Sequence, residues 1–438
     1  MKTRSLSCFV RRKFLTDNNT IVRFKKVTVD FQSIDETSIR GELVADSFQF
    51  GRTVVLESGS ILVANSVFLK PNSSVTFSTG SSCRIDFVNV FGTLRMKQNS
   101  YLLYKILYIA PFSNLIYESP MQAVIPPEAT IALSGAVFAL QLTVLGTLSI
   151  PSEANASIQI PIISDSNSGC SIKIQGYLTV ISTFSVKQCA VSGAGVLRMP
   201  NGFVANNSIV VSVSQVEVSG FLVVPTGAQI RFQNSTLKLF SCAANVSGHI
   251  FADSKSHFVL SSGSSFISQN AVLSGFGSMT YSGDVSVTST VVHATTILGT
   301  ASSSIACISS AFGAEYILNA GLVMFFYNNR KYEIIYSLHI VAGLFTVRNC
   351  TVLANKVTFS KSSVLSCSDC KAFEVSGLYT LNSSVEVLGI MRVVPALASP
   401  PLQISSFYPV IKDNKLSSIQ NITGNHAECI EVKHFKSY

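Results

Sequence analysis

The sequence is short of charge, since only 13% of its 438 residues are Asp, Glu, Lys or Arg. That is about half the usual share of a soluble globular chain. This low charge excludes charge-driven disorder. Because 47% of the residues are hydrophobic, the chain has enough apolar surface for a large core. Tryptophan is absent altogether, and this absence argues against a sugar-stacking cleft unless Tyr or Phe takes its place.

Long apolar runs are absent as well. The most apolar stretches, residues 101–112 and 321–327, are both shorter than the ~20 residues that a membrane-spanning helix needs. We therefore expect no transmembrane segment. The N-terminus has basic residues without a following apolar stretch, so it is not a signal peptide.

The net charge of +9 is unevenly distributed, because much of it lies within residues 1–26. A nucleic-acid-binding protein usually has a basic stripe interleaved with stacking aromatics. The rest of the chain has only isolated charges of both signs. We therefore expect no nucleic-acid partner and interpret residues 1–26 as a basic leader or an N-terminal cap.

What the sequence does contain is internal repetition. A glycine followed by alternating apolar residues recurs, and from Gly146 to Gly377 successive copies lie 19–34 residues apart. The copies begin at Gly92, Gly146, Gly176, Gly195, Gly220, Gly248, Gly277, Gly299, Gly321, Gly343 and Gly377. Each copy reads as a short strand with one apolar face. Stacking such strands buries that face, and glycine would make the corners by adopting positive φ.

The fold class predicted is all-β, a right-handed parallel β-helix (β-solenoid) of irregular 19–34-residue coils, roughly fifteen to twenty in number. Tandem β-sandwiches are the alternative, because their strands also recur at short intervals. The solenoid would span residues 27–395, with an irregular, tyrosine-rich segment at residues 99–128. Residues 396–438 would form a C-terminal cap or tail. Asn328-Asn329 would make a hairpin turn.

The ten cysteines fit a structural role better than a metal or redox site. Cys170 and Cys189 lie 19 residues apart, and Cys350 and Cys370 lie 20 apart, about one coil in each case. Each pair would form either a disulfide bond or a stack of buried thiols. Cys367 is a further candidate for one of these two states. The one Cys-x-x-Cys sequence, Cys367 to Cys370, lacks the second ligand pair of a zinc site. We expect no metal.

Nine Asn-x-Ser/Thr sequons are possible glycosylation sites if the chain is exported from a eukaryotic cell. They are Asn18, Asn72, Asn155, Asn206, Asn234, Asn245, Asn349, Asn382 and Asn421. They favour a secreted or cell-surface location, although no signal peptide is present; a cytoplasmic location is the alternative.

Catalytic signatures are not apparent. Glycoside cleavage needs two facing carboxyl groups, yet the sequence has no Asp-Asp or Asp-x-Asp pair, and Asp35-Glu36 reads as a turn. The run from Asp253 to His257 holds an acid, a hydroxyl and a base, but we interpret it as a solvated strand face. Phosphate-binding and dinucleotide-binding glycine motifs are missing, so we name no catalytic residue and no cofactor.

Between residues 40 and 395 the glycine-led coils resemble the pectin-lyase-like β-helix group and the β-helical stalks of surface adhesins. The resemblance implies a β-rod but transfers no site, because the lyases' calcium-binding Asp clusters and catalytic Arg have no counterpart here. The hypothesis is a non-enzymatic surface or extracellular protein for adhesion, binding or structural display, or a fragment of a larger repeat protein. Its partner would be a carbohydrate or a cell-surface protein. The alternative is a carbohydrate-active β-helix enzyme, either a polysaccharide lyase or a glycoside hydrolase.

Overall fold

The computed structural model describes twelve stretches of the chain, and every regular element in them is a β-strand. The stretches are residues 6–10, 21–24, 27–31, 37–164, 169–182, 184–187, 189–205, 207–321, 323–327, 331–348, 351–380 and 384–393. The strands pair in parallel and stack as a β-solenoid of about 14 turns. The predicted β-solenoid is therefore confirmed, with about 14 turns rather than the fifteen to twenty predicted. Tandem sandwiches are excluded, because their sheets are antiparallel.

The chain divides into two compact units at Val216/Glu217, which are described one at a time. The strands of unit 1 are β1 (Leu6–Val10), β2 (Ile21–Arg23), β3 (Val27–Phe31), β4 (Thr37–Ile39), β5 (Glu42–Phe50), β6 (Thr53–Leu56), β7 (Ile61–Leu69), β8 (Ser74–Phe77), β9 (Ser82–Val90), β10 (Thr93–Met96), β11 (Tyr101–Ile109), β12 (Asn114–Tyr117), β13 (Ala123–Ile125), β14 (Thr130–Leu133), β15 (Ala136–Phe138), β16 (Leu142–Val144), β17 (Thr147–Ile150), β18 (Asn155–Ile158), β19 (Ile162–Ile163), β20 (Ser171–Ile174), β21 (Tyr177–Val180), β22 (Phe184–Ser185), β23 (Ala190–Met199) and β24 (Phe203–Val204). Strand β25 (Ile209–Val224) contains the division.

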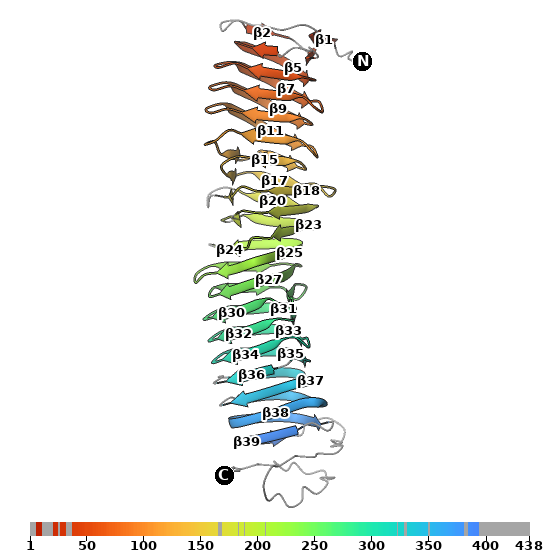
Figure 1. Ribbon diagram of the computed structural model, residues 1–438, viewed down its shortest axis with the longest axis vertical. Coiled ribbons are helices and arrows are strands. Elements are labelled where there is room, and N and C mark those ends of the chain that lie inside the picture. Colours follow the sequence, from red (N-terminus) through yellow and green to blue (C-terminus); the bar gives the residue numbers. More distant parts are fainter. Residues whose placement is uncertain are drawn as a thin grey trace, which may run out of the picture. The chain divides into compact units, whose positions relative to one another are not determined.

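In unit 1 the long strands β5, β7, β9 and β11 lie one above another (Figure 1) and form one column of paired strands. Glu42 pairs with Ile61, Ile61 with Ser82, and Ser82 with Tyr101, so the coils are 19, 21 and 19 residues long. Strands β4, β6, β8, β10, β12 and β15 form a second column. A third column is formed by strands β13, β16, β19 and β22.

The strands of unit 2 are β26 (Gln229–Phe232), β27 (Thr236–Val246), β28 (His249–Ala252), β29 (His257–Leu260), β30 (Ser265–Gln269), β31 (Val272–Tyr281), β32 (Asp284–Thr288), β33 (Val291–Gly299), β34 (Ser304–Ile308), β35 (Ala311–Asn319), β36 (Val323–Tyr327), β37 (Lys331–Arg348), β38 (Thr351–Thr380) and β39 (Ser384–Val393). Its coils are equally regular, since Val272 pairs with Val291, which pairs with Ala311. Strand β36 pairs in parallel with β37. The predicted hairpin at Asn328-Asn329 is therefore wrong, because a hairpin would pair these strands in antiparallel fashion.

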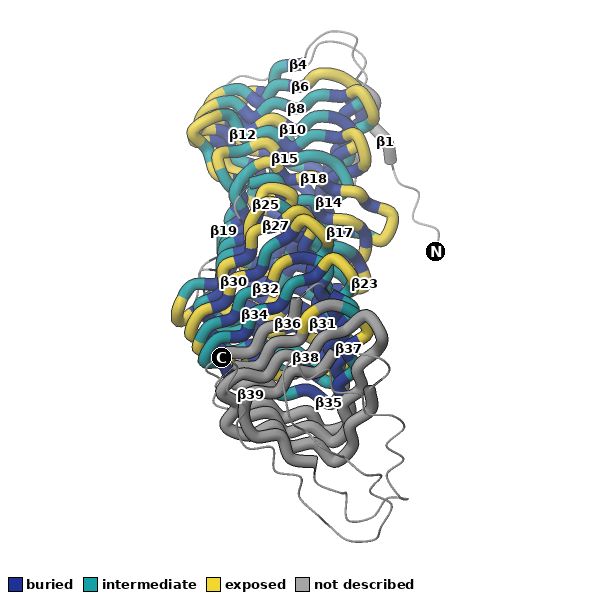
Figure 2. The backbone as a smooth tube through the Cα atoms, turned by 60° about the horizontal axis from the view of Figure 1, so that its bottom comes forward, coloured by how far each residue is buried: buried dark blue, intermediate teal, exposed yellow. Residues whose placement is uncertain are grey.

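Alternation along each strand builds the core. Strand β9 alternates buried and more exposed residues, and the same pattern recurs along the tube of Figure 2. In unit 1, Phe31 stacks on Phe50 with ring centroids 5.3 Å apart. In unit 2, Phe258 packs edge-on against Phe266 at 5.4 Å. Because each coil brings a new apolar row against the previous one, the core runs continuously along each unit.

The repeated glycines act for a different reason from the one predicted. Between Gly92 and Gly321, only Gly220 among the phrase glycines has positive φ. A Cβ on Gly92 would instead collide with the carbonyl oxygens of Ser73 and Lys70 in the preceding coil. The phrase glycine therefore permits close approach of two backbones. Phrase glycines also lie at different corners of the coil. Gly146 precedes β17, whereas Gly176 precedes β21, which pairs with β18. The glycine spacing therefore overestimates the coil length.

Corners that do need positive φ carry another signature, a four-residue turn ending in a buried serine. In the turn that precedes β9, Gly80 has φ of 74° and Ser81 donates both its backbone N–H and its hydroxyl to the carbonyl of Ser78. The turns before β7 and β11 are built alike, with Gly59 and Asn99 at the positive-φ position. The serine satisfies its own buried hydroxyl and closes the corner.

Candidate functional site

Several exposed apolar side chains of unit 1 lie on or beside β11, three of them within the segment 99–128 that the sequence marks as irregular. Tyr101, Leu103 and Ile106 of β11 are 62%, 44% and 42% exposed, and Phe87 of β9 is 46% exposed. Ile106 and Phe87 are register partners, so their side chains lie side by side. We call these four residues the β11 patch.

The β11 patch lies on both sides of a corner at Lys105, where the alternation along β11 slips by one position. Tyr104 lies between the exposed residues, is buried, and donates its hydroxyl to the carbonyl of Val124 at 3.2 Å. Burial, with a smaller effect from Tyr117, raises the pKa of Tyr104 well above its ordinary value. A neutral phenol anchored in this way holds β11 in place, so the patch is presented by a fixed backbone.

Charged residues lie within and beside the β11 patch. Lys105, between Tyr104 and Ile106, donates to the carboxylate of Asp86 at 3.1 Å, and both side chains are solvent-accessible. Arg84 is the register partner of Leu103 and is exposed. The exposed apolar side chains of the patch are therefore interspersed with charged ones.

A second aromatic group lies at the corner that follows β7, β9 and β11. Phe91 packs between Phe68 and Tyr108, with ring centroids 5.1 and 5.8 Å away. Phe91 keeps 37% of its surface exposed. In the turn after β11, Phe112 has φ of 62° and is fully exposed. Tyr108 and Phe112 belong to the predicted irregular segment 99–128, and Pro71 and Pro111 mark two such turns 40 residues apart in the sequence.

Four carboxylates in the described part of unit 1 form ion pairs. Asp30 pairs with Lys70, and the other pairs are Glu42 with Arg23, Glu118 with Arg95, and Asp86 with Lys105. The predicted turn at Asp35-Glu36 lies outside the described residues.

Asp253 in unit 2 has a structural task. Its carboxylate accepts hydrogen bonds from the backbone N–H groups of Asn234 and Lys255 and from the hydroxyl of Ser256. Partial burial acts to raise the pKa of Asp253, but these hydrogen bonds and the charge of Lys255 lower it below its ordinary value. The hydroxyl of Ser256 is thus directed at Asp253, while His257 contacts Ser278 at 2.8 Å. No nucleophile–base–acid relay forms among these residues.

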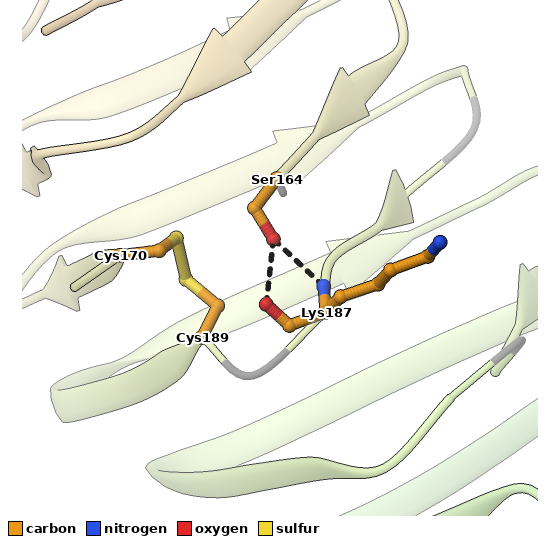
Figure 3. The surroundings of a disulfide bond; sticks show 4 residues. All are labelled: Ser164, Cys170, Lys187 and Cys189. Atoms are coloured by element: carbon orange, nitrogen blue, oxygen red, sulfur yellow. Dashed lines mark hydrogen bonds between the residues drawn. A yellow bond between two sulfur atoms is a disulfide. The ribbon is translucent and has the colours of Figure 1, made fainter. Parts of the chain in front are cut away.

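Cys170 and Cys189 form a disulfide bond (Figure 3). They directly precede β20 and β23, which pair in adjacent coils. Beside them Ser164 donates its hydroxyl to the carbonyl of Lys187 and accepts the Lys187 N–H (Figure 3). The bond therefore joins two neighbouring coils at one corner.

The other cysteines with described side chains are buried thiols, namely Cys83, Cys242 and Cys307. Burial raises the pKa of Cys242 to about 11 and that of Cys83 well above its ordinary value. Of the remaining predicted cysteines, Cys350 and the side chains of Cys367 and Cys370 lie outside the described residues.

Four of the nine sequon asparagines are described, and all four are exposed: Asn72, Asn155, Asn234 and Asn245. The other five, Asn18, Asn206, Asn349, Asn382 and Asn421, lie outside the described residues.

Within the described part of the chain no group of three or more His, Cys, Asp or Glu side chains is placed to hold a metal ion. The same residues include no helix long and apolar enough to span a membrane. In the comparisons with known proteins, no family model, no curated protein and no solved structure matches this chain.

Proposed function

We propose that this chain is a non-enzymatic extracellular or cell-surface β-solenoid that binds a protein on another cell or in the surrounding matrix through the β11 patch. The observation that carries the proposal is the patch itself. Tyr101 and Leu103 lie before the corner at Lys105, Ile106 and Phe87 lie after it, and all four are exposed on the paired strands β9 and β11. Contiguous exposed apolar side chains mark interaction sites.

The chemistry of the β11 patch favours a protein partner over a carbohydrate. Tyrosine anchors surrounded by aliphatic side chains are typical of the energetic centre of a protein interface. Recognition of a sugar needs converging hydrogen-bond donors and acceptors beside the aromatic ring. Two polar neighbours of the patch, Lys105 and Asp86, are instead paired with each other.

The disulfide bond between Cys170 and Cys189 supports the extracellular part of the proposal. Disulfides persist in oxidising compartments and are rare in the cytosol. The exposure of all four described sequon asparagines agrees with the same location.

The binding test uses the labelled full chain on intact cells of the source organism. We expect Tyr101→Ser combined with Ile106→Ser to weaken binding tenfold or more, which corresponds to about 1.4 kcal/mol. The matched control is Val291→Ser, an equally exposed apolar residue of unit 2, which should bind as the parent does. Loss of binding after protease treatment of the cells supports a protein partner. Loss only after glycosidase treatment would contradict it, as would an unchanged double variant.

The location test is independent of the partner. A membrane-impermeant amine reagent applied to intact cells should label the native chain. Alternatively, the native chain should be detected in the medium. A chain that is labelled only after the cells are permeabilised would contradict an extracellular role.

A further inference from the structure

Asn155 and Tyr177 face solvent side by side. Asn155 begins β18 and is the register partner of Tyr177 in β21, one coil further on. Partners in a parallel sheet point to the same side, and both side chains are exposed, Tyr177 by 44%. Arg198, from the coil beyond, lies 4.9 Å from the centroid of the Tyr177 ring. The ring is therefore covered from the Arg198 side and open toward the coil that carries Asn155.

Asn72 also lies near an exposed ring, Phe91, although this ring packs between Phe68 and Tyr108 and only 37% of the residue remains exposed. Asn72 occupies the turn between β7 and β8, and the next coil passes directly along this turn. Phe91 N–H donates to the carbonyl of Leu69, and Thr93 N–H donates to that of Ser73. The exposed ring of Phe91 thus lies one coil away from Asn72, about 4.8 Å in strand spacing.

A third asparagine in unit 2 repeats the arrangement with an aliphatic neighbour. Asn245 of β27 is the register partner of Ile267 in β30, which is 53% exposed. The fourth described sequon differs, because the backbone of Asn234 is bonded to the carboxylate of Asp253 in the next coil. Three sequons thus adjoin an exposed large apolar side chain, and one adjoins a charge.

We infer that Asn72, Asn155 and Asn245 carry N-linked glycans, and that the first N-acetylglucosamine of each covers Phe91, Tyr177 and Ile267 respectively. The inference rests on the proposed extracellular function, since the modification occurs during export. The asparagine side-chain nitrogen attacks C1 of the first sugar of a polyprenyl-diphosphate-linked oligosaccharide. The C1–N bond forms, the C1–O bond breaks, the polyprenyl diphosphate leaves with the electron pair, and the amide loses one proton.

The apolar face of the sugar explains why these side chains are tolerated at the surface. The sugar is tied to its asparagine through a short side chain, so it reaches only the immediate neighbours in the adjoining coil. Its C–H groups can pack on an aromatic or aliphatic surface while its hydroxyls stay in water. Each glycan would therefore remove one exposed apolar side chain from solvent without any partner protein.

Occupancy is tested by expressing the full chain behind a cleavable export leader in a glycosylating eukaryotic cell. Enzymatic glycan release in ¹⁸O-water followed by peptide mass analysis should mark Asn72, Asn155 and Asn245. The exposed asparagines outside sequons, Asn65 and Asn99, are the controls and should stay unmarked. Ser157→Ala should abolish the mark at Asn155, and Ser157→Thr should restore it. A secreted, folded chain with these three asparagines unmodified would overturn the inference.

Packing is tested by NMR of the same glycoprotein with ¹³C-labelled acetyl groups. The N-acetyl methyl signals of the sugars on Asn72 and Asn155 should be shifted upfield by the adjoining rings, relative to the released glycopeptides. Phe91→Ser and Tyr177→Ser should each abolish the shift at their own site only. Tyr177→Phe should retain it, because the ring is kept. Unshifted signals on occupied sites would overturn the packing.

Failure of the glycan tests can be distinguished from failure of the proposed function. The leader forces export, so site occupancy and packing are measured whatever the native location is. A native chain confined to the cell interior would refute the extracellular proposal, and then the inference falls with it. An exported native chain with bare asparagines refutes the glycan inference alone.

Discussion

Lys70 donates hydrogen bonds to both carboxylate oxygens of Asp30, at 3.0 and 3.2 Å, across 40 residues of sequence. The Asp30 side chain is only 7% exposed, whereas that of Lys70 is 33% exposed. The pair therefore ties β3 to the corner that follows β7, two coils away in the same unit.

The two partners should respond differently to replacement. Lys70→Met leaves a buried carboxylate without its cation, and we expect the local stability of β3 to fall by roughly 1–3 kcal/mol. Asp30→Asn should cost less, because the lysine can turn to water. Amide hydrogen exchange of β3 measures both. The control is Lys105→Met, which breaks the exposed pair with Asp86 and should change stability by less than about 1 kcal/mol.

Two kinds of glycine should be separable by substitution. Gly92→Ala forces a Cβ against the carbonyl oxygens of the preceding coil, and Gly92→Asn should be at least as harmful. A Cβ on Gly80 would make only an ordinary contact with Ser58 Oγ at 3.9 Å, but φ is 74°, so Gly80→Ala should cost about 1–2 kcal/mol. Gly80→Asn should cost less, because Asn99 holds the same turn position one coil on with φ of 58°.

The measurement is the chemical denaturation midpoint of each variant, with hydrogen exchange locating the loss. Equal rescue by asparagine at Gly92 and Gly80 would show that backbone conformation, rather than close approach, decides both positions.

The Asp253 turn should weaken in acid. Because the folded pKa of Asp253 lies below its ordinary value of 3.8, the ionised carboxylate stabilises unit 2 at pH values above about 4. This contribution is lost as the pH falls through the lower folded pKa. Hydrogen exchange of the Asn234 and Lys255 amides should reveal it as a loss of protection, corrected for intrinsic rates.

Asp253→Asn should remove that pH dependence while leaving the fold intact. The neighbouring turn closed by the Ser264 N–H on the carbonyl of Ser261 contains no carboxylate, so its protection should not change over the same range. If both turns lose protection together, global acid unfolding rather than the Asp253 carboxylate is responsible.

Opening the disulfide should destabilise its own coils most. Cys170 and Cys189 close a loop of one coil, and a loop of this length contributes about 3 kcal/mol through the entropy of the unfolded chain. We expect Cys170→Ser with Cys189→Ser to lower protection of β20 and β23 far more than that of β5. Adding a reductant to this double variant should have no further effect on these strands, whereas in the parent it should reproduce the loss.

The repeat and the parallel stacking could be predicted from the sequence because alternation and recurrence are local properties. Coil length could not be read from the glycines, since Gly146 and Gly176 lie at different corners and serve close backbone approach. The spacing of Cys170 and Cys189 matches one coil but leaves disulfide and thiol equally open. The Asp30–Lys70 pair and the neighbours of Asn155 depend on register, which a single sequence does not specify.

The β11 patch was only half visible in the sequence. Tyr101, Tyr104 and Tyr108 stand out as an aromatic cluster, but the three have different fates: exposed, buried and half-buried. Tyr101 and Tyr104 take opposite faces by ordinary alternation, whereas the face of Tyr108 depends on the corner at Lys105, where the alternation of exposed and buried residues slips by one position.

Because the corners closed by serines are equivalent, the length of unit 1 can change by whole coils. Ser60, Ser81 and Ser100 close equivalent turns, and Ser82 takes the same place after its turn as Ile61 does. Removing residues 61–81 would join Ser60 to Ser82 and bring β5 against β9 with every inward residue still facing inward. Removing one residue more or fewer would exchange the inward and outward positions of the strand that follows. Length variation among such chains should therefore be tolerated in multiples of about twenty residues and selected against in between.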